Sequence, residues 1–598
     1  MPFIEKLNRC VAQSVVGRYF RLDGSSATKP RANSRFTTEL YAGLTTFVTM
    51  AYIVSTNALI LSDTGGTCVC DDPTGTNPTC EDVPSYEDCV YTVKKDIITA
   101  TCAMACISSV LMGLLANLPF GLAPGMGLNA YFAYTVVGYR GSGSIPFRTA
   151  LAAVCVEGII FFFLSIFGIR QWLAKLIPSS IKVATGAGIG LYLAFIGMQS
   201  SAGIGLIGGD SATLVSLGAC PAQYKDDHGV CQGHTMESAT TWMGILGFAI
   251  IAVLLLFRVK GAILVGILFV SGLSWIRTTP FTYFPYNAEG NQAFDYFKQV
   301  ATFHPIEHTF AQLDFDLASG EIWVALITFL YVDILDTTGT MYSMAKFGGF
   351  TDEFGDFEGS TMAFITDAVC ISLGAVFGTS PVTTFVESGA GITEGGRTGI
   401  TGMVVGLCFF LSLFFSPIFA SFPPWATGPA LICVGSMMLK GVREINWDYP
   451  GDAIPAFLTI AIMPLTYSIA YGLIAGILSY VVINGAAFVI ERVARGRIAI
   501  PDKNLREPWN QIRLDVEGGG ITPPWMYRLW RRVRGRPVNR SPPTSPADGL
   551  RPSGDTAGEL IAIPALPRDY DGSKVSKAAS ILSSHSTSHE EKHGSHVV

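Results

Sequence analysis

The chain has 598 residues, of which 49% are hydrophobic and only 14% are charged, and its formal net charge is −6. Such a composition cannot be folded into soluble domains without leaving large apolar patches in water, which excludes an ordinary soluble enzyme. Long apolar segments alternate with short polar ones. The sequence therefore predicts an all-α polytopic membrane protein with polar tails.

The N-terminal segment, residues 1–36, is rich in Lys and Arg and lacks the apolar core of a removable signal peptide. Basic residues near membrane spans favour the cytoplasmic side. We therefore predict a cytoplasmic N-terminal segment, followed by a membrane domain at 37–497.

Two polar loops contain six cysteines. The first follows a predicted span at 40–61 and is acidic, and the second lies between predicted spans at 186–206 and 242–257; they hold Cys68, Cys70, Cys80 and Cys89, then Cys220 and Cys231. A zinc site would need tighter paired spacing, whereas an oxidising compartment favours disulfides. We predict that both loops face outside and carry disulfides, with the pairing left open.

The C-terminal region supports this orientation. A last predicted span at 469–490 is followed by a run of arginines, which places the C-terminus in the cytoplasm too and implies an even number of spans, about fourteen. Arg140 and Arg148 fall on the outer side and count against the rule. The tail at 498–598 is rich in Pro, Ser, Gly and His, and we predict that it is cytoplasmic and largely disordered.

Two apolar segments are too irregular to be lipid-exposed helices. Residues 117–134 read NLPFGLAPGMGLNAYFAY, and residues 377–396 read FGTSPVTTFVESGAGITEGG. Pro and Gly break both, and such backbone is tolerated at membrane depth only inside the protein or beside a cavity. Matching broken spans are the usual sign of a transport site.

The spans that precede these segments are also similar. GLTTFVTMAYIV, from Gly43, resembles ALITFLYVDILD, from Ala325. We predict two repeats at approximately 37–276 and 320–497, and an odd number of spans in each would give them opposite orientations. Chance similarity between apolar segments is the alternative.

Acidic residues inside spans are the sharpest chemical signal, because a buried charge is costly unless it has a function or a partner. Asp333 and Asp336 are spaced to share one helix face, and a like-charge pair this close tends to keep one proton. They are candidate proton carriers, or one of them braces the broken helix. Glu387 lies at the second break, where we predict contact with a ligand.

Further candidates are less specific. Asn129 stands at the other half-helix start and offers both donors and acceptors, although it could instead be an N-cap. Ser388, next to Glu387, joins the predicted substrate-binding set of Glu387, Asn129 and Asp333. Glu157 and Asp367 are each alone in an apolar run, where a carboxyl is as often a structural hydrogen-bonding group as a site residue.

Three stretches carry a resemblance to a known family: PGMGLNAYFAY from Pro124, DILDTTGT from Asp333, and SPVTTFVESGAGITEGGRTG from Ser380. The chain resembles the fungal AzgA-type hypoxanthine/adenine/guanine permeases, relatives of the nucleobase-ascorbate transporters. The resemblance implies a seven-plus-seven inverted repeat with core and gate domains, short strands in the broken spans, proton symport and a homodimer. By position it implies Asn129 and Glu387 as substrate residues and Asp333 with Asp336 as the intramembrane pair.

The chemistry agrees with a neutral purine, whose N–H groups can be accepted by carboxylates and an Asn carbonyl. We predict a plasma-membrane importer of hypoxanthine, adenine and guanine, driven by protons, with lipid as its surroundings and no metal, cofactor or nucleic acid. Uracil, xanthine or a small anion on the same fold is the alternative. A channel is less favoured because no selectivity-filter run is present, and an enzyme because no nucleophile or phosphate-binding motif has its required context.

Overall fold

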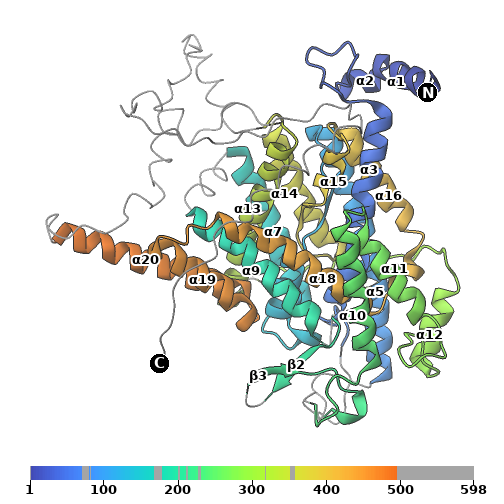
Figure 1. Ribbon diagram of the computed structural model, residues 1–598, viewed down its shortest axis with the longest axis vertical. Coiled ribbons are helices and arrows are strands. Elements are labelled where there is room, and N and C mark those ends of the chain that lie inside the picture. Colours follow the sequence, from blue (N-terminus) through green and yellow to red (C-terminus); the bar gives the residue numbers. More distant parts are fainter. Residues whose placement is uncertain are drawn as a thin grey trace, which may run out of the picture. The chain divides into compact units, whose positions relative to one another are not determined.

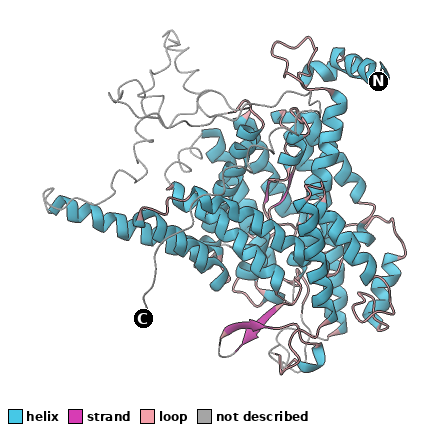
Figure 2. Cartoon of the chain, in the orientation of Figure 1, coloured by secondary structure: helices cyan, strands magenta, loops and turns pink. Residues whose placement is uncertain are grey.

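The computed structural model describes residues 2–69, 80, 83–167, 178–199, 203–210, 213–225, 231–316, 318–350 and 357–493. Helices dominate these residues (Figure 2). Eight described helical segments are long and apolar enough to cross a membrane, and shorter apolar helices accompany them. The predicted polytopic helical fold is confirmed, whereas the predicted tail at 498–598 lies outside the described residues.

One group of helices packs around α5. Its members contact one another and include the helices on either side of both broken spans. They are α3 (Phe36–Met50), α4 (Ile53–Ser62), α5 (Pro84–Leu111), α7 (Phe147–Phe167), α13 (Gly320–Phe347), α14 (Ser360–Phe377) and α16 (Gly399–Ser412), with η1 (Met112–Ala116) continuing α5. We call this group the core.

A second group, which we call the gate, packs around α9 and α18 (Figure 1). Its members are α9 (Ser179–Met198), α10 (Ala239–Leu256), α11 (Ala262–Ser274), α18 (Pro424–Met438), η5 (Leu439–Glu444), α19 (Pro450–Leu465) and α20 (Ile469–Val493). A Cβ on Gly190 or Gly435 would clash with the backbone carbonyl of the other glycine. Small residues thus let α9 and α18 approach closely, as membrane helices commonly do.

The two broken spans meet in the core. Strand β1 (Leu122–Pro124) pairs antiparallel with β4 (Val382–Thr384), with Ala123 opposite Thr383. Short helices follow each strand, namely α6 (Met126–Ala130) with η2 (Tyr131–Val137) after β1, and α15 (Ser388–Thr393) after β4. The pairing satisfies backbone groups that lipid could not, and it confirms the expected strands in both broken spans. The repeat boundaries remain a prediction.

The molecule has two distinguishable ends (Figure 1). Helix α1 (Pro2–Gln13) and α2 (Val15–Tyr19) lie at what we call the terminal end, and an ion pair between Arg21 and Glu358 places the end of α13 and start of α14 there too. The hairpin of β2 (Ile207–Asp210) and β3 (Leu214–Leu217) lies at the opposite, disulfide end. Smaller helices complete the described chain: η3 (Tyr139–Gly141), η4 (Ala222–Tyr224), α12 (Ala288–Phe297) and α17 (Ser416–Ala420).

Disulfides form in both cysteine-bearing loops. Cys68 pairs with Cys89, and Cys220 pairs with Cys231. Cys80 is also disulfide-bonded, whereas Cys70 lies outside the described residues. The prediction that these loops carry disulfides is confirmed.

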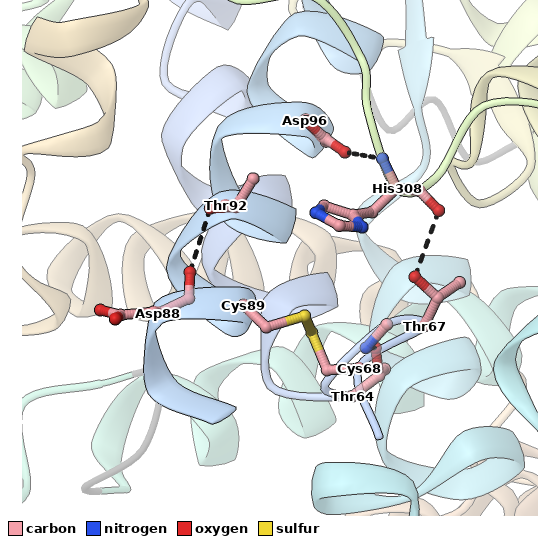
Figure 3. The surroundings of a disulfide bond; sticks show 9 residues. Thr64, Thr67, Cys68, Asp88, Cys89, Thr92, Asp96 and His308 are labelled. Carbon is pink, nitrogen blue, oxygen red and sulfur yellow. Dashed lines mark hydrogen bonds between the residues drawn. A yellow bond between two sulfur atoms is a disulfide. The ribbon is translucent and has the colours of Figure 1, made fainter. Parts of the chain in front are cut away.

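The Cys68–Cys89 disulfide lies beside hydrogen bonds that His308 makes to Asp96 and Thr67 (Figure 3). The backbone N–H of His308 donates to the Asp96 carboxylate at 2.6 Å, and the Thr67 hydroxyl donates to the His308 carbonyl at 3.2 Å. These bonds fix the segment before α13 against α5. The disulfide end is therefore cross-linked both covalently and by hydrogen bonds.

Candidate functional site

The junction of the two broken spans is closed by backbone hydrogen bonds at both ends of the strand pair. The Gly125 N–H donates to the Pro381 carbonyl at 2.9 Å, and the Phe385 N–H donates to the Gly121 carbonyl at 3.0 Å. Because both half-helices start from this ladder, α6 and α15 are fixed relative to each other. The residues at their starts therefore form one rigid platform.

Glu387 stands at the start of α15, and its side chain makes no capping hydrogen bond to that helix. The hydroxyl of fully buried Tyr52 instead donates to Glu387 Oε1 at 2.7 Å. Tyr52 lies in the break between α3 and α4, so a third irregular point of the core reaches the platform. The sequence reasoning missed Tyr52, whose only signal was a polar-tipped aromatic in an apolar span.

Asn129 is fully buried within α6, whose N-cap is Gly125, so it is not the N-cap. Its Oδ1 accepts a hydrogen bond from the Ser380 hydroxyl. Within the described residues its Nδ2 has no hydrogen-bond partner. A buried amide donor without a partner is costly, so this group is suited to donate to a ligand or a water molecule.

Ser388 is also fully buried, and its Oγ accepts a hydrogen bond from the Gly121 N–H at 3.0 Å. This contact adds a side-chain link between the two broken spans. The structure thus gives Ser388 a bracing position, while its hydroxyl proton can still be donated.

Asp333 and Asp336 have different surroundings although they are one turn apart on α13. Asp336 lines a cavity and lies within electrostatic reach of Glu387. Asp333 is fully buried, accepts a hydrogen bond of 2.6 Å from the Thr337 hydroxyl, and acts electrostatically on Glu157. The structure therefore brings Asp336, rather than Asp333, together with Glu387.

The cavity has a volume of about 440 Å³ and lies between the core and the gate. Its walls come mainly from the second half of α13 and the first turns of α9, with Val386 beside Glu387 and Glu444 at the end of η5. Both Lys182 and Tyr342 belong to its wall. These residues place it toward the terminal end, and its size lies in the range usual for small-molecule sites.

Contacts between core and gate close the disulfide end. The Tyr467 ring, just before α20, contacts the rings of Tyr134 and Tyr192 edge to face, with centroids 5.5 and 5.2 Å apart. The Tyr467 hydroxyl donates to Gln199 Oε1 at 2.8 Å, and the Thr135 hydroxyl donates to the Tyr467 carbonyl at 3.0 Å. Tyr467 thus links the gate to Tyr134 and Thr135 of η2 at the disulfide end, whereas the cavity lies toward the terminal end.

Asp63 borders this closure at the end of α4. Its carboxylate accepts a hydrogen bond of 2.7 Å from the Tyr134 hydroxyl. Burial raises the pKa of Asp63 from 3.8 to about 6, against the opposing effects of Tyr134, Lys94 and Arg140. The closed end therefore contains an acid that titrates near neutral pH.

The aromatic residues that follow Asn129 in the first broken span pack against other aromatic rings of the core. Tyr131 meets Phe329 edge to face, and Phe132 meets Phe147 in the same way. All four are buried in the core cluster. No group of three or more His, Cys, Asp or Glu suited to a metal ion occurs among the side chains that the structure describes.

Comparison with known proteins agrees with this architecture. Residues 88–474 match the profile Xan_ur_permease, described as a permease family. The chain is 55% identical over 533 residues to "Efflux pump notK'" of Aspergillus versicolor, covering 88% of this chain and 91% of that protein. It is 51% identical over 534 residues to "Putative xanthine/uracil permease C887.17" of Schizosaccharomyces pombe, covering 89% and 84%.

A relative with lower sequence identity is named as a permease of purine bases. The chain is 34% identical over 450 residues to "Guanine/hypoxanthine permease PbuO" of Bacillus subtilis, covering 75% of this chain and 91% of that protein. The extent of these matches and the family profile lead to one conclusion: the chain belongs to the xanthine/uracil permease family.

Proposed function

We propose that this permease is a proton-coupled symporter of purine nucleobases, with hypoxanthine, adenine and guanine as substrates. The observation that carries the proposal is Asp336 in the cavity wall, which lies within electrostatic reach of Glu387 at the junction of the two broken spans. The bacterial relative named as a guanine/hypoxanthine permease supports the same substrate class.

Recognition would use both halves of the platform. A purine presents N–H donors that the Glu387 carboxylate can accept, and ring nitrogens or an exocyclic oxygen to which the Asn129 amide can donate. Tyr52 holds Glu387 in place, and Ser388 braces the platform. Asp333 would contribute indirectly, through α13. Hydrogen bonds to charged groups in a site shielded from water give strong discrimination between related bases.

Proton coupling would follow from the repulsion between Asp336 and Glu387. Two carboxylates within electrostatic reach of each other favour a state in which one of them holds a proton. A proton bound at Asp336 leaves Glu387 ionised and able to accept a purine N–H. Proton and substrate then favour each other's binding, which is the requirement for symport.

The structure corresponds to one state of an alternating-access cycle. The cavity lies toward the terminal end, whereas Tyr467 joins core to gate at the disulfide end. With both termini in the cytoplasm, as the basic flanks predict, this state faces the cytoplasm. Movement of gate against core would open the disulfide end and close the cavity, as in transporters built from inverted repeats.

A second candidate function is export of a small aromatic solute. The relative that is named as an efflux pump and is 55% identical to this chain favours it. A symporter works in either direction according to its gradients, so the same site serves both. We propose import at the plasma membrane by a homodimer as the physiological arrangement.

Uptake measurements test this proposal. Cells that lack nucleobase transporters and express this chain would be given labelled hypoxanthine, adenine, guanine, xanthine and uracil, with and without a protonophore. We expect saturable uptake of the three purines that the protonophore abolishes. Uptake only of xanthine or uracil would contradict the substrate assignment, and export from preloaded cells without uptake would favour the efflux function.

A further inference from the structure

Three buried acids, one each on α7, α13 and α14, are close enough to interact electrostatically. Glu157 of α7 lies within electrostatic reach of Asp333 of α13 and Asp367 of α14. Each of the three side chains is fully buried. The charged side chains that act on Glu157 in the described part of the chain are therefore themselves acids, and none of them neutralises it.

Glu157 differs from ordinary buried acids. Neither of its carboxyl oxygens has a hydrogen-bond partner among the described residues. A carboxylate at this depth would normally accept several hydrogen bonds or face a cation. The missing hydrogen-bond partner among the described residues is an observation separate from the clustering, and it points to a bound proton.

Helix α7 packs closely against α14 next to Glu157. The Ser372 hydroxyl donates to the Cys155 carbonyl at 3.1 Å and joins α14 to α7. A Cβ on Gly158 would lie 2.7 Å from the Ser372 backbone nitrogen and 2.9 Å from the Ala368 carbonyl oxygen. The two helices are therefore in backbone contact next to Glu157, which favours a proton over a larger ligand.

We propose that Glu157 is a proton-binding site, occupied at neutral pH and separate from the acids that face the cavity. Binding converts the Glu157 carboxylate to a neutral carboxylic acid, which removes the negative charge that Asp333 and Asp367 disfavour in a buried environment. The groups that face it are Asp367 on α14 and Asp333 on α13, with Cys370 near Asp367. Asp336, in the cavity wall, and Glu387 form a separate acidic pair.

This site does not depend on the identity of the transported solute. It lowers the negative charge between α7, α13 and α14, and Asp333 of this cluster lies one turn of α13 away from the cavity acid Asp336. The failure of the purine assignment would therefore leave this inference intact, and the reverse also holds.

Infrared spectroscopy of the purified full-length protein tests it directly. A protonated carboxyl without a hydrogen bond has a carbonyl-stretching band well separated from the bands of ionised carboxylates. We expect this band at pH 7 in the wild type and its loss in Glu157→Gln. The matched control is Glu321→Gln at the exposed start of α13, which should leave the band unchanged.

Two further measurements keep the inference open to refutation. Glu157→Gln preserves the size and neutrality of the protonated acid, so its yield and melting temperature should equal those of the wild type. A pH titration of the wild type should show the band persisting through pH 7 and disappearing only in alkaline solution. An unchanged band in Glu157→Gln, or a wild type without the band at pH 7, would overturn the proposal.

Discussion

The phenolic hydroxyl of Tyr52 donates a hydrogen bond of 2.7 Å to Oε1 of Glu387, across 335 positions of sequence. Tyr52 lies at the interruption between α3 and α4, and Glu387 lies at the interruption between β4 and α15. One bond therefore connects irregular points of the two halves of the chain. It also fixes the carboxylate that we propose as the main purine contact.

Removing this hydrogen bond should weaken substrate binding without removing the acid. Loss of a hydrogen bond to a charged group costs about 1.5 to 3 kcal/mol, so Tyr52→Phe should raise the KM for hypoxanthine roughly 10-fold or more. Surface expression should be retained. The matched control is Tyr91→Phe, because the Tyr91 hydroxyl is buried without a hydrogen-bond partner among the described residues. Equal KM values for Tyr52→Phe and wild type would show that Tyr52 does not position Glu387.

The different surroundings of the α13 acids give a prediction about proton coupling. Asp336→Asn should flatten the dependence of uptake on external pH, because this acid lines the cavity and lies within electrostatic reach of Glu387. Asp333→Asn should lower transport while leaving the shape of the pH profile nearly intact, because Asp333 lies behind the cavity. Initial uptake rates measured over a range of external pH distinguish the two. The reverse pattern would move the coupling site to Asp333.

Asp63 gives a prediction about stability. Burial raises its pKa to about 6, from 3.8, so the folded state favours the protonated form. Its contribution to stability is then fully present below about pH 4 and is lost as pH rises through about 6. The melting temperature of purified wild type should fall over this interval more than that of Asp63→Asn. Parallel curves for the two proteins would contradict this role of Asp63.

The disulfides test the orientation of the chain. We expect the Cys68–Cys89 and Cys220–Cys231 bridges to face outside, as their acidic loops and the basic flanks of other spans predict. An impermeant reductant added to intact cells should free thiols that an impermeant maleimide then labels. Labelling only after permeabilisation would invert the topology and place the cavity on the outer side.

The sequence predicts the backbone of the site better than its side-chain contacts. Pro and Gly mark both broken spans, because these residues cannot continue a lipid-exposed helix. The sequence does not predict that Asp333 and Asp336 have different neighbours. A spacing of three residues leaves about 60° between two side chains on a helix, which is enough for them to contact different helices. The hydrogen bonds of Glu387 to Tyr52 and of Asn129 to Ser380 join segments far apart in the chain, so no local pattern encodes them.

The central claim, that Glu387 holds the purine, is tested most directly by calorimetric binding of hypoxanthine to the purified protein. Removing a charged acceptor that pairs with a ligand N–H should cost about 2 to 4 kcal/mol, or roughly 30-fold to nearly 1000-fold in affinity. Glu387→Ala should therefore bind hypoxanthine hardly at all, Glu387→Asp weakly, and Glu387→Gln partially through its carbonyl oxygen. A folded Glu387→Ala protein with the wild-type Kd would show that Glu387 does not contact the purine.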